Sequence, residues 1–262
     1  MTELAQALAL GAVGAWYLVN AGRSPAPVAR WRVAAFAGGV IATLVAIASP
    51  IDELAARSLT GHMAQHLLLT SVAAPLIVLG RPVTLLLKSG STRRWARRSI
   101  RSRTFGVLTH PVVAWVAFVG SMYASHLGSL YEAALESPAW HAAEHSLFLA
   151  TALLFWLPVA GETAAPNRLG HGARLLYLAF AMPAEGFLAL ALFSADRVLY
   201  PTYAGPNALD DQRSAAALLW IAGDAVFLAA LIVAAVAWKA DEEARQRRIE
   251  DGQDVRRTRA SS

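Results

Sequence analysis

The sequence predicts an all-α integral membrane protein, a bundle of seven transmembrane helices with the N-terminus outside and the C-terminus in the cytoplasm. Of its 262 residues, 56% are hydrophobic and 16% are charged, whereas an ordinary soluble domain has about 45–50% and 25%. The hydrophobic residues form seven long runs, and the basic residues gather in alternate connections between them. A water-soluble fold and a disordered chain are therefore excluded.

Seven segments approach the roughly 20 apolar residues needed to cross about 30 Å of hydrocarbon. They run over Leu4 to Val19, Val33 to Ser49, His62 to Leu79, Val107 to Ala124, Trp140 to Ala160, Leu175 to Phe193 and Ala215 to Trp238. The flank before the first segment carries Glu3 and no basic residue, so we expect a retained helix rather than a cleaved signal peptide. Residues 1–239 should form the transmembrane domain. Residues 240–262 mix both charges and should form a cytoplasmic tail, helical at first and then partly disordered.

The basic residues indicate which side faces the cytoplasm, because short cytoplasmic loops carry an excess of lysine and arginine. Twenty of the 23 lie in the first, third and fifth connections and in the tail, and the other three are Arg57, Arg197 and Arg213. The net charge is +5. We attribute the densest cluster, Arg93 to Arg103, to topology and contact with anionic membrane lipid rather than to nucleic acid.

The histidines are the most informative residues. H-M-A-Q-H places His62 and His66 four residues apart at the start of the third segment, and H-A-A-E-H does the same for His141 and His145 in the fifth. Each pair therefore shares one helix face. His126 closes the fourth segment on the same expected outer side. Five of the seven histidines should thus meet at the outer surface, and the other two lie at the opposite edge.

This histidine pattern is typical of a metal site. Imidazole nitrogens at i and i+4 can bind one ion, and two such helices can supply four ligands. The chain has no cysteine, which excludes a thiolate site. Zinc suits the nitrogens, whereas Met122, one turn before His126, offers a soft sulfur that favours copper(I), and Met63 points away from the His62 face. A haem with two axial histidines stays open.

Four acidic residues could assist this chemistry. The H-x-x-E-H spacing also matches a metalloprotease pattern with Glu144 as general base. Gln65 occupies the equivalent position of the other pair and the outer loops are short, so we expect no enzyme activity and a role for Glu144 in orienting an imidazole. Asp211 should cap the seventh segment or assist the ligands. Glu185 and Asp224 lie near the middle of their segments, where a carboxylate is costly and usually functional.

Short motifs follow one another in a fixed order over about residues 55 to 230. They are H-M-A-Q-H-L-L-L (His62 to Leu69), A-P-L and L-G-R-P (Ala74 to Pro82), H-P (His110-Pro111), L-Y-E-A-A-L (Leu130 to Leu135) after His126, H-x-x-E-H (His141 to His145), F-W-L-P-V-A-G (Phe155 to Gly161), Y-P-x-Y (Tyr200 to Tyr203), D-Q (Asp211-Gln212) and G-D (Gly223-Asp224). In this order and in a seven-span setting, they resemble the polytopic bacterial CtaG-type cytochrome c oxidase assembly factors.

The resemblance implies a multi-pass protein of the bacterial plasma membrane that is needed to form an active caa-type oxidase and helps to deliver copper to the oxidase subunits. The five clustered histidines match the family's pattern. The dinuclear copper centre of such an oxidase lies in an exterior domain, on the side where the basic residues place these histidines. A copper transporter that uses Glu185 and Asp224, and a bis-histidine haem protein, stay open as alternatives.

The predicted topology can be tested by cysteine labelling, for which the cysteine-free chain gives a clean background. We expect Ser58→Cys and Ser129→Cys to react with an impermeant thiol reagent in intact cells, because both lie in connections poor in basic residues. Ser91→Cys and Ser102→Cys should stay unlabelled. Labelling of Ser91→Cys from outside would invert the orientation and place the histidines on the cytoplasmic side.

Overall fold

The computed structural model describes residues 2–24, 26–90, 92–127, 134, 137–160 and 167–260. All regular structure in these residues is helical. The elements are α1 (Thr2–Gly22), α2 (Arg30–Ile47), α3 (Pro50–Ala55), α4 (Leu59–Leu67), the π-helix η1 (Leu68–Ala73), α5 (Ala74–Leu79), α6 (Pro82–Lys88), α7 (Arg93–Ile100), α8 (Arg103–Leu108), α9 (Pro111–Leu127), α11 (Pro138–Trp156), α12 (His171–Phe193), the short 3-10 helix η2 (Pro201–Tyr203) and α13 (Ala208–Ala260).

Each of the seven predicted segments falls on helical structure. The third is shared by α4, η1 and α5, and the fourth begins in α8 and continues in α9 after a break at His110. Within the described residues, four helical stretches are long and apolar enough to cross a membrane: Arg30–Ile47, Leu59–Lys88, His171–Phe193 and Ala208–Asp251. The chain is therefore an all-helical membrane protein. The count of seven spans and the orientation of the termini stay predictions.

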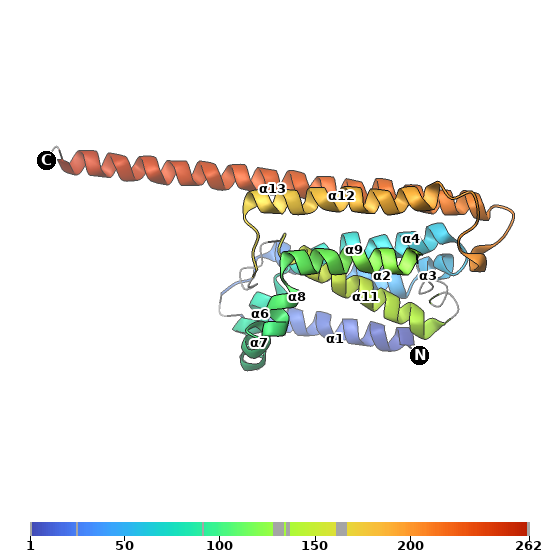
Figure 1. Cartoon of the computed structure of the whole chain (residues 1–262). Coiled ribbons are helices and arrows are strands. Elements are labelled where there is room, and N and C mark those ends of the chain that lie inside the picture. The colour runs from blue at the N-terminus through green and yellow to red at the C-terminus, as the bar shows by residue number, and fades with distance from the viewer. Residues whose placement is uncertain are drawn as a thin grey trace.

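The long helices form a bundle with two distinct ends. Figure 1 shows the N-terminus, α3 and the start of α4 at one end, and α6, α7 and α8 at the other. α13 packs along α12 and continues beyond the bundle toward the C-terminus (Figure 1). Four arginines of α7 belong to the densest basic cluster of the sequence. The basic cluster and the histidine-bearing start of α4 thus lie at opposite ends of the bundle.

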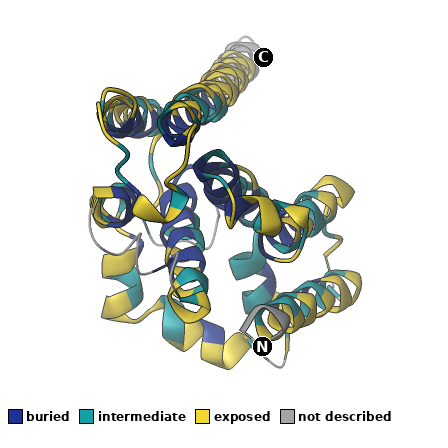
Figure 2. Cartoon of the chain, turned by 90° about the vertical axis from the view of Figure 1, so that its right-hand side faces the viewer, coloured by how far each residue is buried: buried dark blue, intermediate teal, exposed yellow. Residues whose placement is uncertain are grey.

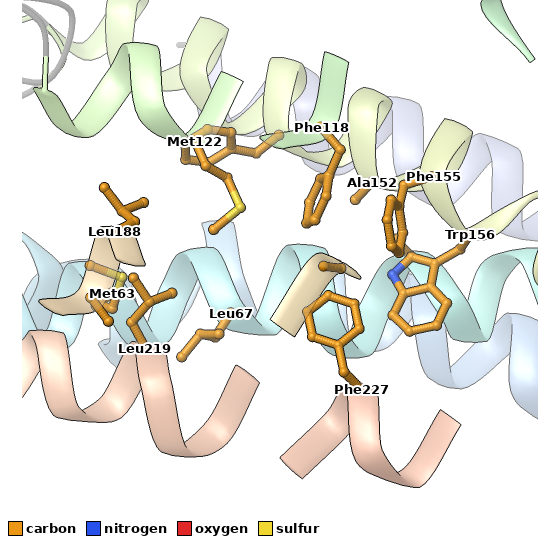
Figure 3. Close-up of a cluster of buried hydrophobic side chains, with 14 of the residues drawn as sticks. Met63, Leu67, Phe118, Met122, Ala152, Phe155, Trp156, Leu188, Leu219 and Phe227 are labelled. Carbon is orange, nitrogen blue, oxygen red and sulfur yellow. The ribbon is translucent and has the colours of Figure 1, made fainter. Parts of the chain in front are cut away.

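The core joins α4, α9, α11, α12 and α13. Figure 2, a view turned by 90°, shows that buried residues lie mainly on helix faces that turn toward neighbouring helices. Figure 3 shows the central part of the core, where the labelled side chains are Met63, Leu67, Phe118, Met122, Ala152, Phe155, Trp156, Leu188, Leu219 and Phe227. Lipid tails are as apolar as these side chains, so close van der Waals packing, rather than escape from water, holds such helices together.

The π-helix η1 follows directly after the histidine-bearing helix α4. Pro75, at the start of α5, has no N–H to donate, so a regular α-helix cannot run unbroken through this stretch. Two hydrogen bonds support the irregular turn. The Thr70 hydroxyl donates to the carbonyl of His66 at 2.8 Å, and the Trp156 indole donates to the carbonyl of Thr70 at 2.9 Å. Wide turns of this kind are frequent beside functional sites.

Gly61 allows α4 to approach α3 closely. A Cβ atom at this position would lie 2.7 Å from the backbone carbonyl carbon of Leu54 and 2.8 Å from its oxygen. Backbone atoms cannot move aside as the end of a flexible side chain can, so only glycine fits here. His62 follows immediately in the sequence, and the close approach therefore sets where its ring lies.

The charged segment after Lys239 remains helical as far as Ala260 in the structure, whereas the sequence predicts that the helix gives way to partial disorder. Acidic and basic side chains here lie three or four residues apart, and Lys239 and Arg247 both pair with Glu243 at 3.9 and 3.7 Å. Such exposed pairs favour helix by a few tenths of a kcal/mol each, about 0.3–0.5 in measured helices.

Some positions used in the sequence analysis lie outside the described residues. They are Ser91 and Ser129 of the labelling test, the L-Y-E-A-A-L motif apart from Ala134, Gly161 at the end of F-W-L-P-V-A-G, and the last two residues of the tail.

Candidate metal centre

Five histidine rings meet at one end of the bundle. α4 provides His62 and His66, α9 ends with His126, and α11 begins with His141 and His145. The ring centroids of neighbouring pairs lie between 4.1 and 6.3 Å apart. Four of the rings are buried and His141 is half-buried. The structure thus brings together all five histidines that the sequence assigns to one cluster.

Asp211 fixes the start of the helix that carries two of these histidines. Its carboxylate accepts hydrogen bonds from the backbone N–H of Leu59 at 2.6 Å and of Thr60 at 3.2 Å, and from the Thr60 hydroxyl at 2.6 Å. Both oxygens therefore serve as a cap for α4, although Asp211 itself belongs to α13. Asp211 thus positions α4, a role that the sequence does not predict, and it also lies in the first turn of its own helix. A part in assisting the ligands stays a prediction.

Tyr203 determines which ring nitrogen of His62 carries the proton. Its hydroxyl donates to the carbonyl of Ala55 at 2.6 Å. A hydroxyl carries one proton, so its oxygen must accept from the Nδ1–H of His62, which lies 3.1 Å away. His62 therefore presents the lone pair of Nε2 to the cluster. Hydrogen bonds of this kind orient metal-binding histidines and increase their basicity.

His126 is oriented in the same way by its own helix. Its Nδ1 lies 2.8 Å from the carbonyl oxygen of Met122, one turn earlier. A carbonyl can only accept, so Nδ1 carries the proton and Nε2 carries the lone pair. Two rings from two different helices are thus held in the tautomer that binds a metal through Nε2.

Glu144 lies directly among the imidazole nitrogens. Its Oε2 is 3.5 Å from Nε2 of His62 and 3.6 Å from Nε2 of His66, and these two nitrogens are 2.8 Å apart. A triangle with these sides has a point about 1.9 Å from all three atoms, against roughly 2.0–2.2 Å for bonds from nitrogen and carboxylate oxygen to zinc. One metal ion slightly out of the plane of the triangle would reach all three atoms. Glu144 therefore lies within reach of the same point as the two imidazole nitrogens. Its predicted role in orienting an imidazole stays a prediction.

The carboxylate of Glu144 also needs positive charge nearby. Its residue is 7% exposed, and its ion-pair partners in the described part of the chain are His62 and His66, which are charged only when protonated. A buried carboxylate beside neutral imidazoles is costly. A bound cation would supply the missing charge.

The second histidine pair has unused nitrogens. Nε2 of His141 and Nε2 of His145 are both buried, and neither has a hydrogen-bond partner among the described residues. The ligand atom of His145 lies within 4.8 Å of those of His62 and His66. Buried polar atoms are nearly always hydrogen-bonded, so unpaired nitrogens that face other nitrogens point to a missing ligand.

Met122 and Met63 belong to the apolar core. Figure 3 shows both thioether side chains in the cluster that also contains Leu188 and Leu219. Met122 contacts His126 through its backbone carbonyl, which accepts the hydrogen bond from Nδ1 of His126. The prediction that its sulfur assists the ligands is therefore not supported by the packing, because the side chain is used between helices.

The two carboxylic acids of the later segments form a separate pair between α12 and α13. Glu185 is 6% exposed, and its carboxylate lies so close to Gly223 that a Cβ there would overlap it. Its electrostatic neighbour is Asp224, whose carboxylate accepts a hydrogen bond from Trp220. Within the described residues, Oε2 of Glu185 has no hydrogen-bond partner. This pair is built into a helix interface, not into the histidine cluster.

The remaining two histidines make other contacts. His110 is exposed in the break before α9. His171, at the start of α12, pairs with Asp241 at 3.2 Å and stacks on Trp238. Both serve as controls for the cluster.

The sequence does not reveal the roles of two supporting residues, Tyr203 and Asp52. Tyr203 ends the Y-P-x-Y motif, which gave a family resemblance but no role for its hydroxyl. Asp52 accepts a hydrogen bond at 2.8 Å from Gln65, which also donates to the carbonyl of Ala46 at 2.6 Å. No periodicity signals either contact, because each joins residues on different helices.

The fold and the site define a multi-helix membrane protein with a buried centre of five histidines and one carboxylate. The chain belongs to the family of cytochrome c oxidase caa3 assembly factors (Caa3_CtaG), whose model matches residues 12–241. The resemblance drawn from the motifs is therefore confirmed.

Relatives from mycobacteria are also similar. An uncharacterized protein of Mycobacterium leprae is 26% identical over 249 residues, which is 88% of this chain and 37% of the relative. Uncharacterized proteins of Mycobacterium bovis and Mycobacterium tuberculosis are 28% identical over 181 residues, 66% of this chain and 27% of each relative. The chain thus spans well under half the length of the curated relatives it matches. No solved structure matches the chain significantly.

We expect Tyr203→Phe to weaken metal binding by about 10-fold or more, because loss of an outer hydrogen bond to a ligating histidine typically costs about 10–100-fold in affinity. Tyr123→Phe is the matched control, since its hydroxyl also donates to a backbone carbonyl, that of Ala184 at 2.8 Å, but on α9 and α12. Titration of the purified proteins with copper measures both. Equal affinity for Tyr203→Phe and the unmodified protein would contradict the assigned tautomer of His62.

Proposed function

We propose that this protein assists the assembly of a cytochrome c oxidase by holding copper, as cargo, in the histidine centre and passing it to an oxidase subunit. One observation carries the proposal: two imidazole nitrogens and a carboxylate oxygen surround a point about 1.9 Å from each, close to the length of a metal–ligand bond. Membership in the caa3 assembly factor family links the site to an oxidase.

The choice of copper rests on the oxidase that the family assembles, not on the geometry of the site. The geometry of the nitrogens suits zinc as well as copper, and the methionine sulfurs that would favour copper(I) lie in the apolar core. The family's client, however, contains a dinuclear copper centre in an exterior domain. Copper is thus the metal that links this site to the assembly of that client.

A haem is less well supported. Two axial histidines bind a haem from opposite faces of a flat macrocycle, whereas the Nε2 atoms of His62 and His66 lie 2.8 Å apart and both approach Glu144. We propose no peptidase activity either. Glu144 of the H-x-x-E-H motif lies at a ligand position beside both nitrogens of the other pair, rather than beside a ligand-bound water.

The proposed site of delivery is the outer face of a bacterial plasma membrane. Seven spans with the N-terminus outside would place the histidine end of the bundle outside and the arginines of α7 inside, in keeping with the positive-inside rule. A carrier loaded at that face can meet the exterior copper domain of the oxidase without moving the ion through the bilayer.

We expect His62→Ala, His66→Ala, His141→Ala and His145→Ala each to weaken copper binding by about 10-fold or more, because each removes a ligand from the histidine centre. Cells that lack the protein should assemble an oxidase depleted in copper. Titration of the purified variants, and metal analysis of the purified oxidase, measure the two effects. His110→Ala and His171→Ala should bind as the unmodified protein does. Equal losses from all the variants would mean adventitious binding at scattered surface histidines.

A transporter is the second candidate, and the buried Glu185 with its half-buried neighbour Asp224 between α12 and α13 favours it. A carrier that loads and unloads at one face does not need these groups, whereas a path through the bilayer would need ionisable groups of this kind. The two functions therefore differ in what they require of the helix interior.

We expect liposomes that contain only this protein to accumulate no copper. Glu185→Gln and Asp224→Asn should leave copper binding within a few-fold, because both residues lie in a helix interface apart from the histidines. Metal analysis of washed liposomes measures uptake. Robust uptake that Glu185→Gln abolishes would replace the assembly role with transport.

A further inference from the structure

We propose that the histidine centre holds two metal ions side by side, an inner ion on His62, His66 and Glu144, and an outer ion on His141 and His145. This proposal rests on the proposed function, because it concerns how the same centre is filled. It adds a second binding site and assigns the two ions different access to the surface.

The centre contains more ligands than one ion uses. Five imidazoles and one carboxylate meet there, whereas a tetrahedral ion takes four ligands. A single ion would leave two buried groups without a partner, and a buried polar group without a partner is costly. A second ion removes this cost.

The inner ion has a complete set of ligands without the second pair. His62, His66 and Glu144 surround one point, as described above. The ring of His126 lies 5.7 Å from that of His66, and its hydrogen bond to Met122 leaves Nε2 as the atom with the lone pair. These four groups come from three helices, and four is the number of ligands that a tetrahedral ion takes.

The outer pair is arranged as a site of its own. The rings of His141 and His145 are 4.1 Å apart on one face of α11. Nε2 of each is buried and has no hydrogen-bond partner in the part of the chain that the structure describes. The ligand atom of His145 lies within 4.8 Å of those of the inner pair. The two ions would therefore be close neighbours, as in two-metal centres, where the separation is about 3.5–4 Å.

Two carboxylates offset the charge of two adjacent cations. Glu144 acts electrostatically on both His141 and His145, and Asp52 acts on His141. Asp52 is held in place by the hydrogen bond from Gln65. A centre for one ion would not need a second carboxylate beside its most exposed histidine.

The inner and the outer ion differ in their access to the surface of the protein. His62, His66 and His126 are buried, whereas His141 is half-buried. A mostly apolar cavity of about 200 Å³ between α1, α2, η1 and α11 reaches His145, and Gln6, Thr43 and Ser146 also line it. The outer ion can therefore be exchanged with a donor or a recipient while the inner ion stays enclosed.

The test is the number of copper ions that the full-length protein retains, measured by mass spectrometry after loading with Cu²⁺ in detergent and removal of free ions. We expect two per chain in the unmodified protein, and one in each of the double variants His141→Ala/His145→Ala and His62→Ala/His66→Ala. The matched control, His110→Ala/His171→Ala, should retain two. Thermal melting shows whether each variant is folded.

Electron paramagnetic resonance gives an independent readout that needs no variant. Two neighbouring Cu²⁺ ions in the unmodified protein should give dipolar broadening and a half-field transition, and His141→Ala/His145→Ala should give the spectrum of an isolated ion. Retention of one ion per chain, without broadening, would overturn the second site and leave the proposed function intact. Retention of no ion by folded His141→Ala/His145→Ala would mean that both histidine pairs are needed for the same binding, and would overturn the separate inner site. Retention of none by the unmodified protein would overturn both proposals.

Discussion

A carboxylate that is only 7% exposed persists inside a helical bundle when donors or positive charge surround it. Glu144 is such a group, and the arrangement of this end of the molecule follows from it. The ring nitrogens of α4 lie 3.5 and 3.6 Å from its oxygen, and the histidines one turn apart on its own helix flank it on either side. At this end of the bundle α4 and α11 therefore meet across a charge, beside the apolar core to which both helices contribute. The need of the Glu144 carboxylate for donors or positive charge therefore affects both the packing of these helices and the affinity of the site for a cation.

The groups that hold the site in shape come from η2 and from the first turn of α13, which are distant from the histidines in sequence. Tyr203 fixes the proton of His62, and Asp211 caps the helix on which His62 and His66 lie. Both act through backbone atoms as well as side chains, since Tyr203 also bonds the carbonyl of Ala55. The last part of the chain therefore completes the site, although it supplies no imidazole. This explains why sequence motifs of the family extend well beyond the histidines.

The helices and the convergence of the histidines follow from local patterns. Apolar runs of sufficient length predict helices, and a spacing of four residues predicts a shared face. The placement of Glu144 as a ligand and of Asp211 as a cap for another helix depends on contacts between distant segments, which no local pattern contains. Met122 shows a limit of local patterns: its spacing from His126 suits a shared site, but packing between helices decides where the sulfur lies. The irregular turn after His66 depends on Pro75 and on the distant Trp156 together.

α13 links the two ends of the molecule mechanically. It is one uninterrupted helix of 53 residues, and at 1.5 Å per residue its length is roughly 80 Å, more than twice the thickness of a bilayer core. Asp211 lies in its first turn, and its carboxylate accepts hydrogen bonds from the start of α4. A rigid rod cannot shift along its axis at one end alone. A shift of α13 along its axis would therefore act, through Asp211, on the helix that carries His62 and His66.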